Sequence, residues 1–406
     1  MAGLEFSFPY NGDISVLDAQ LALNARGGNR VREVYLNIPQ EIAGSGRAGG
    51  SDRMTDDEFG RIADRIHAAG VGVDMTVNAT CGGSSWYDED VVKRLVEFVR
   101  RMHEDHGVEA ITLANPFHIE QVRAACPNIE ISASVLSEID CVSRAQAFAD
   151  AGATTFTPAT SINRDLKLLA TISRRCGLEV KLMVNEGCLY KCPYRTFHMN
   201  LISHRSQESR PEGQSFSFAC GERIEKDRGE IFRSNWVRPE ELGLYAKAGA
   251  AHFFKIVGRD MLASKVLRSC TAYFEETYDG NLLDLMCSSI GFYNVEKSAY
   301  IDNKSLDTSG YFKRLSTCNR KCHDCSYCRE LADKYVRYGW VTEENLHDMG
   351  QGHLAARRKF FHHQGVQPGP GAVEGRGVPA GAAAQNQDLR LKNIIYVSQS
   401  HCQMMQ

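Results

Sequence analysis

Short apolar runs alternate with charged amphipathic segments over the first two thirds of the chain. Runs rich in β-branched and aromatic residues that end in Gly, Pro or Asn are typical of buried strands, and apolar residues at helical spacing are typical of amphipathic helices. The predicted strands are 4–8, 33–38, 71–78, 110–116, 129–134, 154–158, 178–184 and 252–257. The predicted helices are 15–23, 55–69, 88–106, 138–151, 164–175, 240–248 and 264–277.

Eight strands that alternate with helices over about 260 residues are typical of an α/β protein with a (β/α)8 TIM-like barrel, which is the fold we predict. An open doubly wound sheet is the alternative, although it usually contains fewer units. Binding groups of a barrel lie after the C-terminal ends of its strands. We therefore predict a substrate-binding role for the polar residues at the strand ends, namely Asn11, Asn37, Asn78, Asn115, Asn185, Lys255 and Arg259.

These strand-end residues have two possible roles. Asparagine is also a good turn former, so each one alone could serve the backbone only. Lys255 and Arg259 would give the barrel mouth positive charge, which suits a carboxylate or phosphate. The Gly44–Arg47 segment would add backbone N–H groups, but it lacks the spacing and the lysine of a P-loop.

Composition narrows the setting. The chain has 406 residues, 43% of them hydrophobic, and a net charge of -3, which gives no general attraction to nucleic acid. It contains no apolar run of about 18 residues, the length that spans a bilayer, and no secretory pattern at its start. Fourteen cysteines without an export signal indicate thiolate chemistry in a reducing compartment, so we expect a cytoplasmic protein.

The segment 185–200 is the strongest candidate for chemistry. Cys188 and Cys192 follow a predicted strand and are in turn followed by Arg195 and His198. Thiols beside polar groups at the mouth of a strand are typical of a metal site, although free cysteines are also common in cores. Cys220 is the predicted third ligand. Cys81 is the candidate fourth ligand, and a three-cysteine cluster with an open iron is the alternative.

A second group of cysteines lies beyond the predicted barrel. Cys318, Cys322, Cys325 and Cys328 are separated by three, two and two residues, which is a strong ligand pattern for zinc or an iron–sulfur cluster. Structural zinc sites more often consist of two separate CxxC pairs, so four cysteines in one compact run favour a [4Fe–4S] cluster over zinc. Its first three cysteines also match the radical SAM motif, but that motif belongs after the first barrel strand and a fourth cysteine follows here. We interpret the isolated cysteines as core or incidental residues: Cys126, Cys141, Cys176, Cys270, Cys287 and Cys402.

The predicted organisation has four parts. Residues 1–262 form the barrel and 263–362 the cysteine-rich region. Residues 363–388 are rich in Gly, Ala, Pro and Gln, which is typical of a disordered linker, and 389–406 form a tail of unknown purpose.

Several motifs together resemble the collagenase-like peptidase family U32. They are the segment 185–200, the Gly44–Arg47 segment, Arg238-Pro239-Glu240, and the strand 254–259 with its Lys-Ile-Val-Gly-Arg sequence. The resemblance implies a TIM barrel with a [4Fe–4S] cluster, ligated here by Cys188, Cys192 and Cys220. It also implies oxygen-independent hydroxylation of a small biosynthetic intermediate, a peptide or RNA, with prephenate as oxygen donor in some relatives. The cysteine spacing departs from the commoner family pattern, so the substrate does not follow.

Three functions remain open from the sequence. The first is a redox enzyme with one or two clusters, in which His198 or His204 is the general acid or base and Arg195 binds an anionic group. The second is a metal-dependent peptidase, in which His198 and Glu186 activate water at a thiolate-bound zinc. The third is a non-catalytic metal-binding partner or scaffold. We expect a small-molecule or peptide substrate and an electron donor or partner subunit, with only weak support for nucleic acid.

Overall fold

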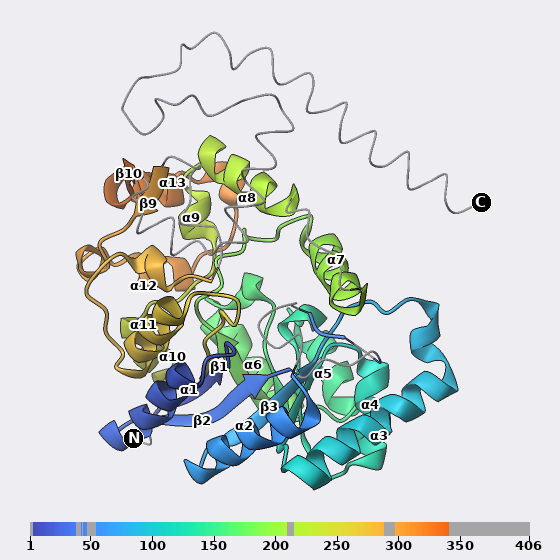
Figure 1. Cartoon of the computed structure of the whole chain (residues 1–406). Helices are drawn as coiled ribbons and strands as arrows, with labels where there is room; N and C mark the ends of the chain where they lie inside the picture. The colour runs from blue at the N-terminus through green and yellow to red at the C-terminus, as the bar shows by residue number, and fades with distance from the viewer. Residues whose placement is uncertain are drawn as a thin grey trace, which may run out of the picture. The chain divides into compact units, whose positions relative to one another are not determined.

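The computed structural model describes residues 3–37, 42, 44–46, 54–208, 215–287 and 297–340 (Figure 1). The predicted linker at 363–388 and the tail at 389–406 lie outside these residues, as does Arg47. Residues 1–356 belong to one compact unit, so the barrel and the cysteine-rich region are parts of the same body. Across the described residues, none of the helices has the length and apolar character needed to cross a membrane.

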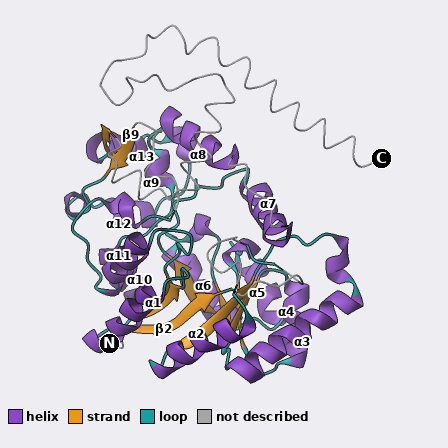
Figure 2. Ribbon diagram, in the orientation of Figure 1, coloured by secondary structure: helices purple, strands orange, loops and turns teal. Residues whose placement is uncertain are grey.

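A closed barrel of parallel strands forms the centre of the described chain, which confirms the predicted fold class (Figure 2). The strands follow chain order around the barrel, and β1 closes it by pairing with both β2 and β8. They are β1 (Glu5–Pro9), β2 (Arg30–Leu36), β3 (Gly72–Val77), β4 (Ala110–Leu113), β5 (Glu130–Ala133), β6 (Thr155–Phe156), β7 (Glu179–Met183) and β8 (Phe253–Lys255).

Helices follow the strands and cover the outside of the barrel (Figure 2). Those that follow β1 to β6 are α1 (Ile14–Leu21), α2 (Asp56–Ala68), α3 (Glu89–His106), α4 (Pro116–Ala125), α5 (Val142–Asp150) and α6 (Leu166–Cys176). In α2, Thr55 and Glu58 form a capping box, and Phe59, Ile62 and Ile66 are buried on one face. The 3.6-residue period of this helix therefore places its apolar stripe against the core.

Two differences from the sequence prediction have local causes. Helix α4 was not predicted, because Asn115-Pro116 is a common turn signal, yet Asn115 caps the helix and Pro116 is its first residue. Helix α5 begins at Val142 rather than at 138, because Glu138 adopts a left-handed conformation with φ 49° after a single turn of 3-10 helix, η3 (Val135–Ser137).

The connection between β7 and β8 is a long one and contains several helices. It contains α7 (Arg195–Glu208), α8 (Ser215–Lys226), α9 (Glu230–Arg233), η5 (Pro239–Glu241) and α10 (Leu242–Lys247). Only the segment that became α10 was predicted as helix. The low hydrophobic periodicity of 195–226, which holds both Arg195 and Cys220, is typical of a segment that serves a site rather than a core.

The barrel interior holds an ion network instead of apolar side chains alone. Lys181 Nζ lies 2.7 Å from Glu33 Oε1 and 3.2 Å from Asp74 Oδ2, and all three side chains are buried. Burial raises the pKa of Glu33 to about 7 against the opposing charge of Lys181. Burial would also raise the pKa of Asp74, but Lys181 and Lys255 outweigh it and hold that pKa at about 2. The network therefore fixes charges directly beneath the mouth.

A partly exposed cluster of ion pairs lies at the N-terminal end of the barrel. Arg32 lies 3.2 Å from Glu5, 3.0 Å from Glu130 and 2.8 Å from Glu179. These acids stand at the starts of β1, β5 and β7, so one guanidinium joins three strands. Residues at the N-terminal end of a TIM barrel usually contribute to stability, so we assign this ion cluster a structural role.

The cysteine-rich region packs on the β7–β8 connection. It contains α11 (Ala263–Phe274), η6 (Leu282–Leu285), η8 (Lys304–Leu306), α12 (Tyr311–Ser316), η9 (Cys322–Asp324), α13 (Tyr327–Tyr335) and the antiparallel pair of β9 (Lys297–Tyr300) and β10 (Arg337–Trp340). The ring of Tyr311 lies 6.1 Å from that of Phe232 and 5.9 Å from that of Trp236. This aromatic contact ties the region to α9 and its following loop.

Candidate active site at the barrel mouth

A small cavity of about 70 Å³ opens at the C-terminal ends of the strands. Its polar lining comes from seven of the strands or the loops after them, as expected for a barrel active site. The lining includes Tyr35, Thr76, Asn78, Ser134, Glu186, Arg195, Lys255 and Arg259. Three of these residues were predicted as site residues on strand position alone (Asn78, Lys255 and Arg259), and Glu186 and Arg195 were predicted from the cysteine segment 185–200.

Lys255 is the buried cation of this cavity. Its Nζ lies 3.8 Å from the ring centroid of Tyr35 and 3.8 Å from Asp74 Oδ2. Burial lowers the pKa of Lys255 to about 8, and the nearby Lys181 acts in the same direction while Asp74 opposes both. A lysine with this pKa can hold an anion or exchange a proton near neutral pH.

Arg259 also lies near the Tyr35 ring, with its guanidinium carbon 5.4 Å from the ring centroid. Its Nη1 donates to Asn37 Oδ1 at 2.6 Å and to Thr76 Oγ1 at 2.9 Å. Asn37 thus orients the guanidinium, which is a supporting role rather than direct contact with a substrate. The Tyr35 hydroxyl donates to the Ile256 carbonyl at 3.0 Å and fixes the ring near the two cations.

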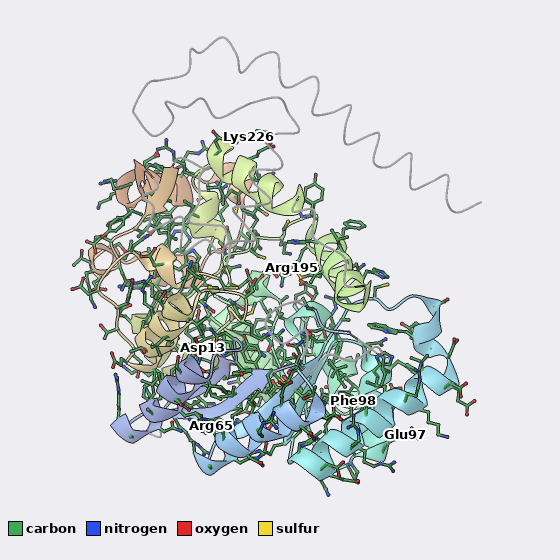
Figure 3. All side chains as sticks on the ribbon, in the orientation of Figure 1. Asp13, Arg65, Glu97, Phe98, Arg195 and Lys226 are labelled. Carbon is green, nitrogen blue, oxygen red and sulfur yellow. The ribbon has the colours of Figure 1, made fainter. Side chains whose placement is uncertain are left out.

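The thiols of the segment 185–200 gather beside this cavity. Arg195 Nη1 donates to Cys188 Sγ at 3.0 Å, and Arg195 Nε donates to Glu138 Oε1 at 2.5 Å. A hydrogen bond from the Cys220 thiol lowers the pKa of Cys192 to about 6, and the same bond together with burial raises the pKa of Cys220. Cys188, Cys192 and Cys220 therefore lie near one another although Cys220 is distant in sequence, and their role as ligands stays a prediction. Figure 3 labels Arg195 near the middle of the molecule.

The comparisons with known proteins agree with this architecture. The model of peptidase family U32 matches residues 22–280, more than half of the chain. The chain belongs to peptidase family U32. An uncharacterized protease of Methanocaldococcus jannaschii, MJ1657, is 28% identical over 310 residues, which cover 75% of this chain and 89% of that protein.

Two solved structures show a distant similarity to this U32 chain. The U32 peptidase Mk0906 is 16% identical with a TM-score of 0.48, over 64% of this chain and 94% of that one. Tryptophan synthase of Mycobacterium tuberculosis is 12% identical with a TM-score of 0.37, over 71% of this chain and 91% of that one.

Other predicted site residues of this U32 protein lie elsewhere or serve the backbone. Asn11 accepts from the Asp13 N–H at 3.2 Å, and Asn115 caps α4. Asn185 is buried and bonds to the backbone of Val257 and Leu285. None of these three lines the mouth cavity. Asn78 does line it, and it donates to Ser134 Oγ at 3.0 Å while accepting from Gly46 N–H at 2.9 Å.

The two candidate histidines lie on α7, outside the lining of the mouth cavity. His198 and His204 are both half-buried. Lys255 and Glu186 are thus the titratable candidates that face the cavity. Glu186 is itself buried, and its charge helps to raise the pKa of Arg195.

Sequence reasoning missed some residues of the site. Glu138 holds Arg195, but the sequence placed it only at the start of the predicted helix 138–151. Cys287 was interpreted as incidental, but its backbone N–H donates to the Asn185 carbonyl at 2.9 Å, three residues before Cys188. Cys81 lies after β3, next to Thr80, whose hydroxyl donates to Asn200 on α7 at 2.6 Å. Both remain candidates for a fourth ligand.

The distances between ligand atoms bear on whether the structure holds a preformed zinc site. Thiolates that bind zinc at about 2.3 Å bring their sulfurs to about 3.8 Å from one another. Among the described residues, one set of three Cys, His, Asp or Glu ligand atoms lies within 4.8 Å of one another, namely Glu5, Glu179 and His252 at the far end of the barrel. That set contains no cysteine and shares Arg32 as a neighbour. The donor type, thiolate, therefore limits the group these cysteines could hold to zinc or an iron–sulfur cluster.

The second cysteine group lies beside the first. Cys318, Cys322 and Cys328 are half-buried and Cys325 is exposed. Burial raises the pKa of Cys328 to about 11, while the charges of Arg164 and Arg233 act to lower it. Cys322 and Cys325 line a wide cavity of about 1080 Å³ that also includes Tyr190, from the loop between Cys188 and Cys192.

Proposed function

We propose that this U32 protein is a redox enzyme with an iron–sulfur cluster at the barrel mouth, acting on a substrate with an anionic group. The observation that carries the proposal is the position of Arg195. Its guanidinium donates to the Cys188 sulfur and also lines the mouth cavity. One buried cation thus joins a thiol group to a binding pocket, an arrangement that a structural metal site away from chemistry does not need.

The cysteines fit an iron–sulfur cluster by donor type. Cys188, Cys192 and Cys220 would hold it, with Cys287 as the fourth ligand we favour because its backbone is bonded to the segment that carries Cys188. A bound cluster would supply one-electron transfer. Arg195 would hold the Cys188 thiolate in its charged form, since hydrogen bonds from a cation favour the ionised sulfur.

Lys255 and Arg259 would bind the anionic group of the substrate. Both lie near one tyrosine ring and line the same small cavity, so two positive charges are available to one anionic group. A cavity of about 70 Å³ holds a carboxylate or phosphate but not a whole nucleobase or a peptide segment. A small carboxylic acid, or an acidic end of a larger molecule, is therefore the substrate class that the pocket fits.

Lys255 would also act as the general acid or base, because it faces the cavity and its pKa of about 8 lies near neutral pH. The reaction we propose is oxygen-independent hydroxylation. A substrate C–H bond becomes C–OH, which oxidises the substrate by two electrons. A hydroxylated carboxylic acid gives up that oxygen, gains the hydrogen and is reduced by two electrons, so the exchange balances.

The test is anaerobic purification followed by iron, sulfide and zinc analysis of the wild type, Cys188→Ser and the matched control Cys141→Ser, which changes an exposed cysteine. We expect Cys188→Ser to lose about four irons and four sulfides and the control to lose none. Zinc without sulfide in the wild type, with hydrolysis of peptide substrates that Cys188→Ser abolishes, would overturn the redox proposal. That outcome would favour a hydrolase, as the family name and the name of the archaeal relative suggest.

A further inference from the structure

The two cysteine-bearing loops touch each other through one contact. The Arg320 guanidinium carbon lies 5.0 Å from the ring centroid of Tyr190. Tyr190 lies between Cys188 and Cys192, and Arg320 lies between Cys318 and Cys322. Arg320 is held in place by a bond from Nη2 to Asn235 Oδ1 at 3.1 Å. Asn235 therefore holds Arg320 in place from a third segment, and the contact connects the two loops that carry the thiols.

Both loops share an unusual backbone conformation. Lys191 and Arg320 have φ values of 46° and 61°, a left-handed conformation that is unfavourable for a non-glycine residue. In the second loop this turn directs the Arg320 N–H to Cys318 Sγ at 3.4 Å. Backbone N–H groups aimed at cysteine sulfur are a common feature of thiolate-bound metal centres and have no use in a loop without one.

We propose that Cys318, Cys322, Cys325 and Cys328 hold a second iron–sulfur cluster, which serves as an electron-accepting centre next to the barrel thiols. Binding of this cluster stands independently of the proposed function, whereas its role in electron transfer rests on it. The four residues fall within one short run, three of them half-buried and one exposed, so the centre has both a protein side and a solvent side.

The solvent side gives access to an electron donor. Cys322 and Cys325 line a cavity of about 1080 Å³, far larger than the mouth cavity of about 70 Å³. A one-electron donor could reach the second centre there but could not enter the mouth. In the step we propose, the donor is oxidised by one electron and the second cluster is reduced by one. The Tyr190 side of the loop faces the same cavity.

The experiment uses the full chain, reconstituted anaerobically with ferrous iron and sulfide, in four forms. They are the wild type, a barrel variant (Cys188→Ser, Cys192→Ser, Cys220→Ser), a second-site variant (Cys318→Ser, Cys322→Ser), and a control (Cys141→Ser, Cys176→Ser). We expect about eight irons in the wild type and in the control, and about four in each of the other two. Each single-centre variant reports its own folding through the cluster that it retains.

Dithionite, as the one-electron probe, then distinguishes the two parts of the inference. We expect the electron paramagnetic resonance spectrum of the reduced wild type to be broadened relative to the sum of the two single-centre variants, because neighbouring spins interact. A barrel variant that binds zinc or no iron would overturn the second cluster, even if the barrel cluster is present in the wild type. A wild-type spectrum equal to the sum would overturn the coupling of the centres. A wild type with only about four irons, which the barrel variant keeps and the second-site variant loses, would contradict the proposed function and leave the second cluster supported.

Discussion

Arg195 Nη1 donates a hydrogen bond to Cys188 Sγ at 3.0 Å. Burial alone would lower the pKa of Arg195, but the charges of Cys188, Glu138 and Glu186 outweigh it and raise that pKa, so the guanidinium stays charged. The side chain is only 9% exposed. A buried cation that is held by one carboxylate and directed at one sulfur is positioned to stabilise a thiolate.

Replacing this cation should weaken the barrel cluster. A hydrogen bond to a charged group contributes about 1.5–3 kcal/mol, which corresponds to roughly 10- to 100-fold in affinity. We therefore expect Arg195→Gln to release iron to a chelator roughly 10- to 100-fold faster than the wild type under anaerobic conditions. Arg174→Gln, which changes an exposed arginine of α6, is the control. Equal release rates for Arg195→Gln and the wild type would show that the bond does not support the cluster.

Lys181→Met should destabilise the whole fold rather than the site alone. The substitution leaves the buried carboxylates of Glu33 and Asp74 without their closest cation. Removing one member of a buried ion pair costs about 3–5 kcal/mol. We expect a decrease of that size in the free energy of unfolding, measured by urea denaturation followed by circular dichroism. Lys247→Met, at an exposed position of α10, should change it by less than about 0.5 kcal/mol. A similar small change for Lys181→Met would mean that the network is not a source of stability.

The barrel could be predicted from the sequence because its strands and helices each have a clear period. The charged residues within the strands could also have indicated an ion network inside the barrel, which the hydrophobic period alone does not predict. Asp74 and Lys181 each stand between apolar neighbours in a strand, and Glu33 stands between Arg32 and Val34. In a barrel the apolar neighbours face the helices, so an alternating charge points to the interior. Their pairing, however, depends on the register between strands that are far apart in sequence.

The site was predictable only in part for a similar reason. Cys188, Cys192 and Arg195 were recognisable because they are close in sequence. Glu138 could not be assigned, because 57 residues separate it from Arg195 and only the closure of the barrel brings them together. The strand-end asparagines show the opposite problem. Asn78 lines the mouth cavity, whereas Asn115 caps a helix, and the same residue type serves both roles.

The fourth ligand of the barrel cluster should be Cys287. Its backbone is bonded to Asn185, at the start of the segment that carries Cys188, whereas Cys81 lies in the loop after β3. We expect Cys287→Ser, prepared in the second-site variant background so that one centre remains, to bind less than half of the iron of that background. Cys81→Ser in the same background is the matched comparison and should retain its iron. The reverse pattern would assign the ligand to Cys81.

Anion binding at the mouth should depend on pH through Lys255. The charged form of this lysine binds the anion, and its pKa of about 8 means that the charge is present below that pH and lost above it. We expect the affinity for inorganic phosphate, measured by calorimetry between pH 6 and pH 10, to fall as pH rises through about 8, in the range where the dianion itself no longer changes charge.

Lys255→Arg tests whether loss of the charge on Lys255 causes this fall in affinity. An arginine stays charged throughout that range, so its affinity should remain level above pH 8, while Lys255→Gln should bind weakly at every pH. Lys247 does not line the mouth cavity, so Lys247→Arg should follow the wild-type curve. If the affinity of Lys255→Arg falls at the same pH as that of the wild type, another group controls binding. The mouth would then hold its anion by Arg259, whose guanidinium keeps its charge, and the pH dependence would have to come from the substrate.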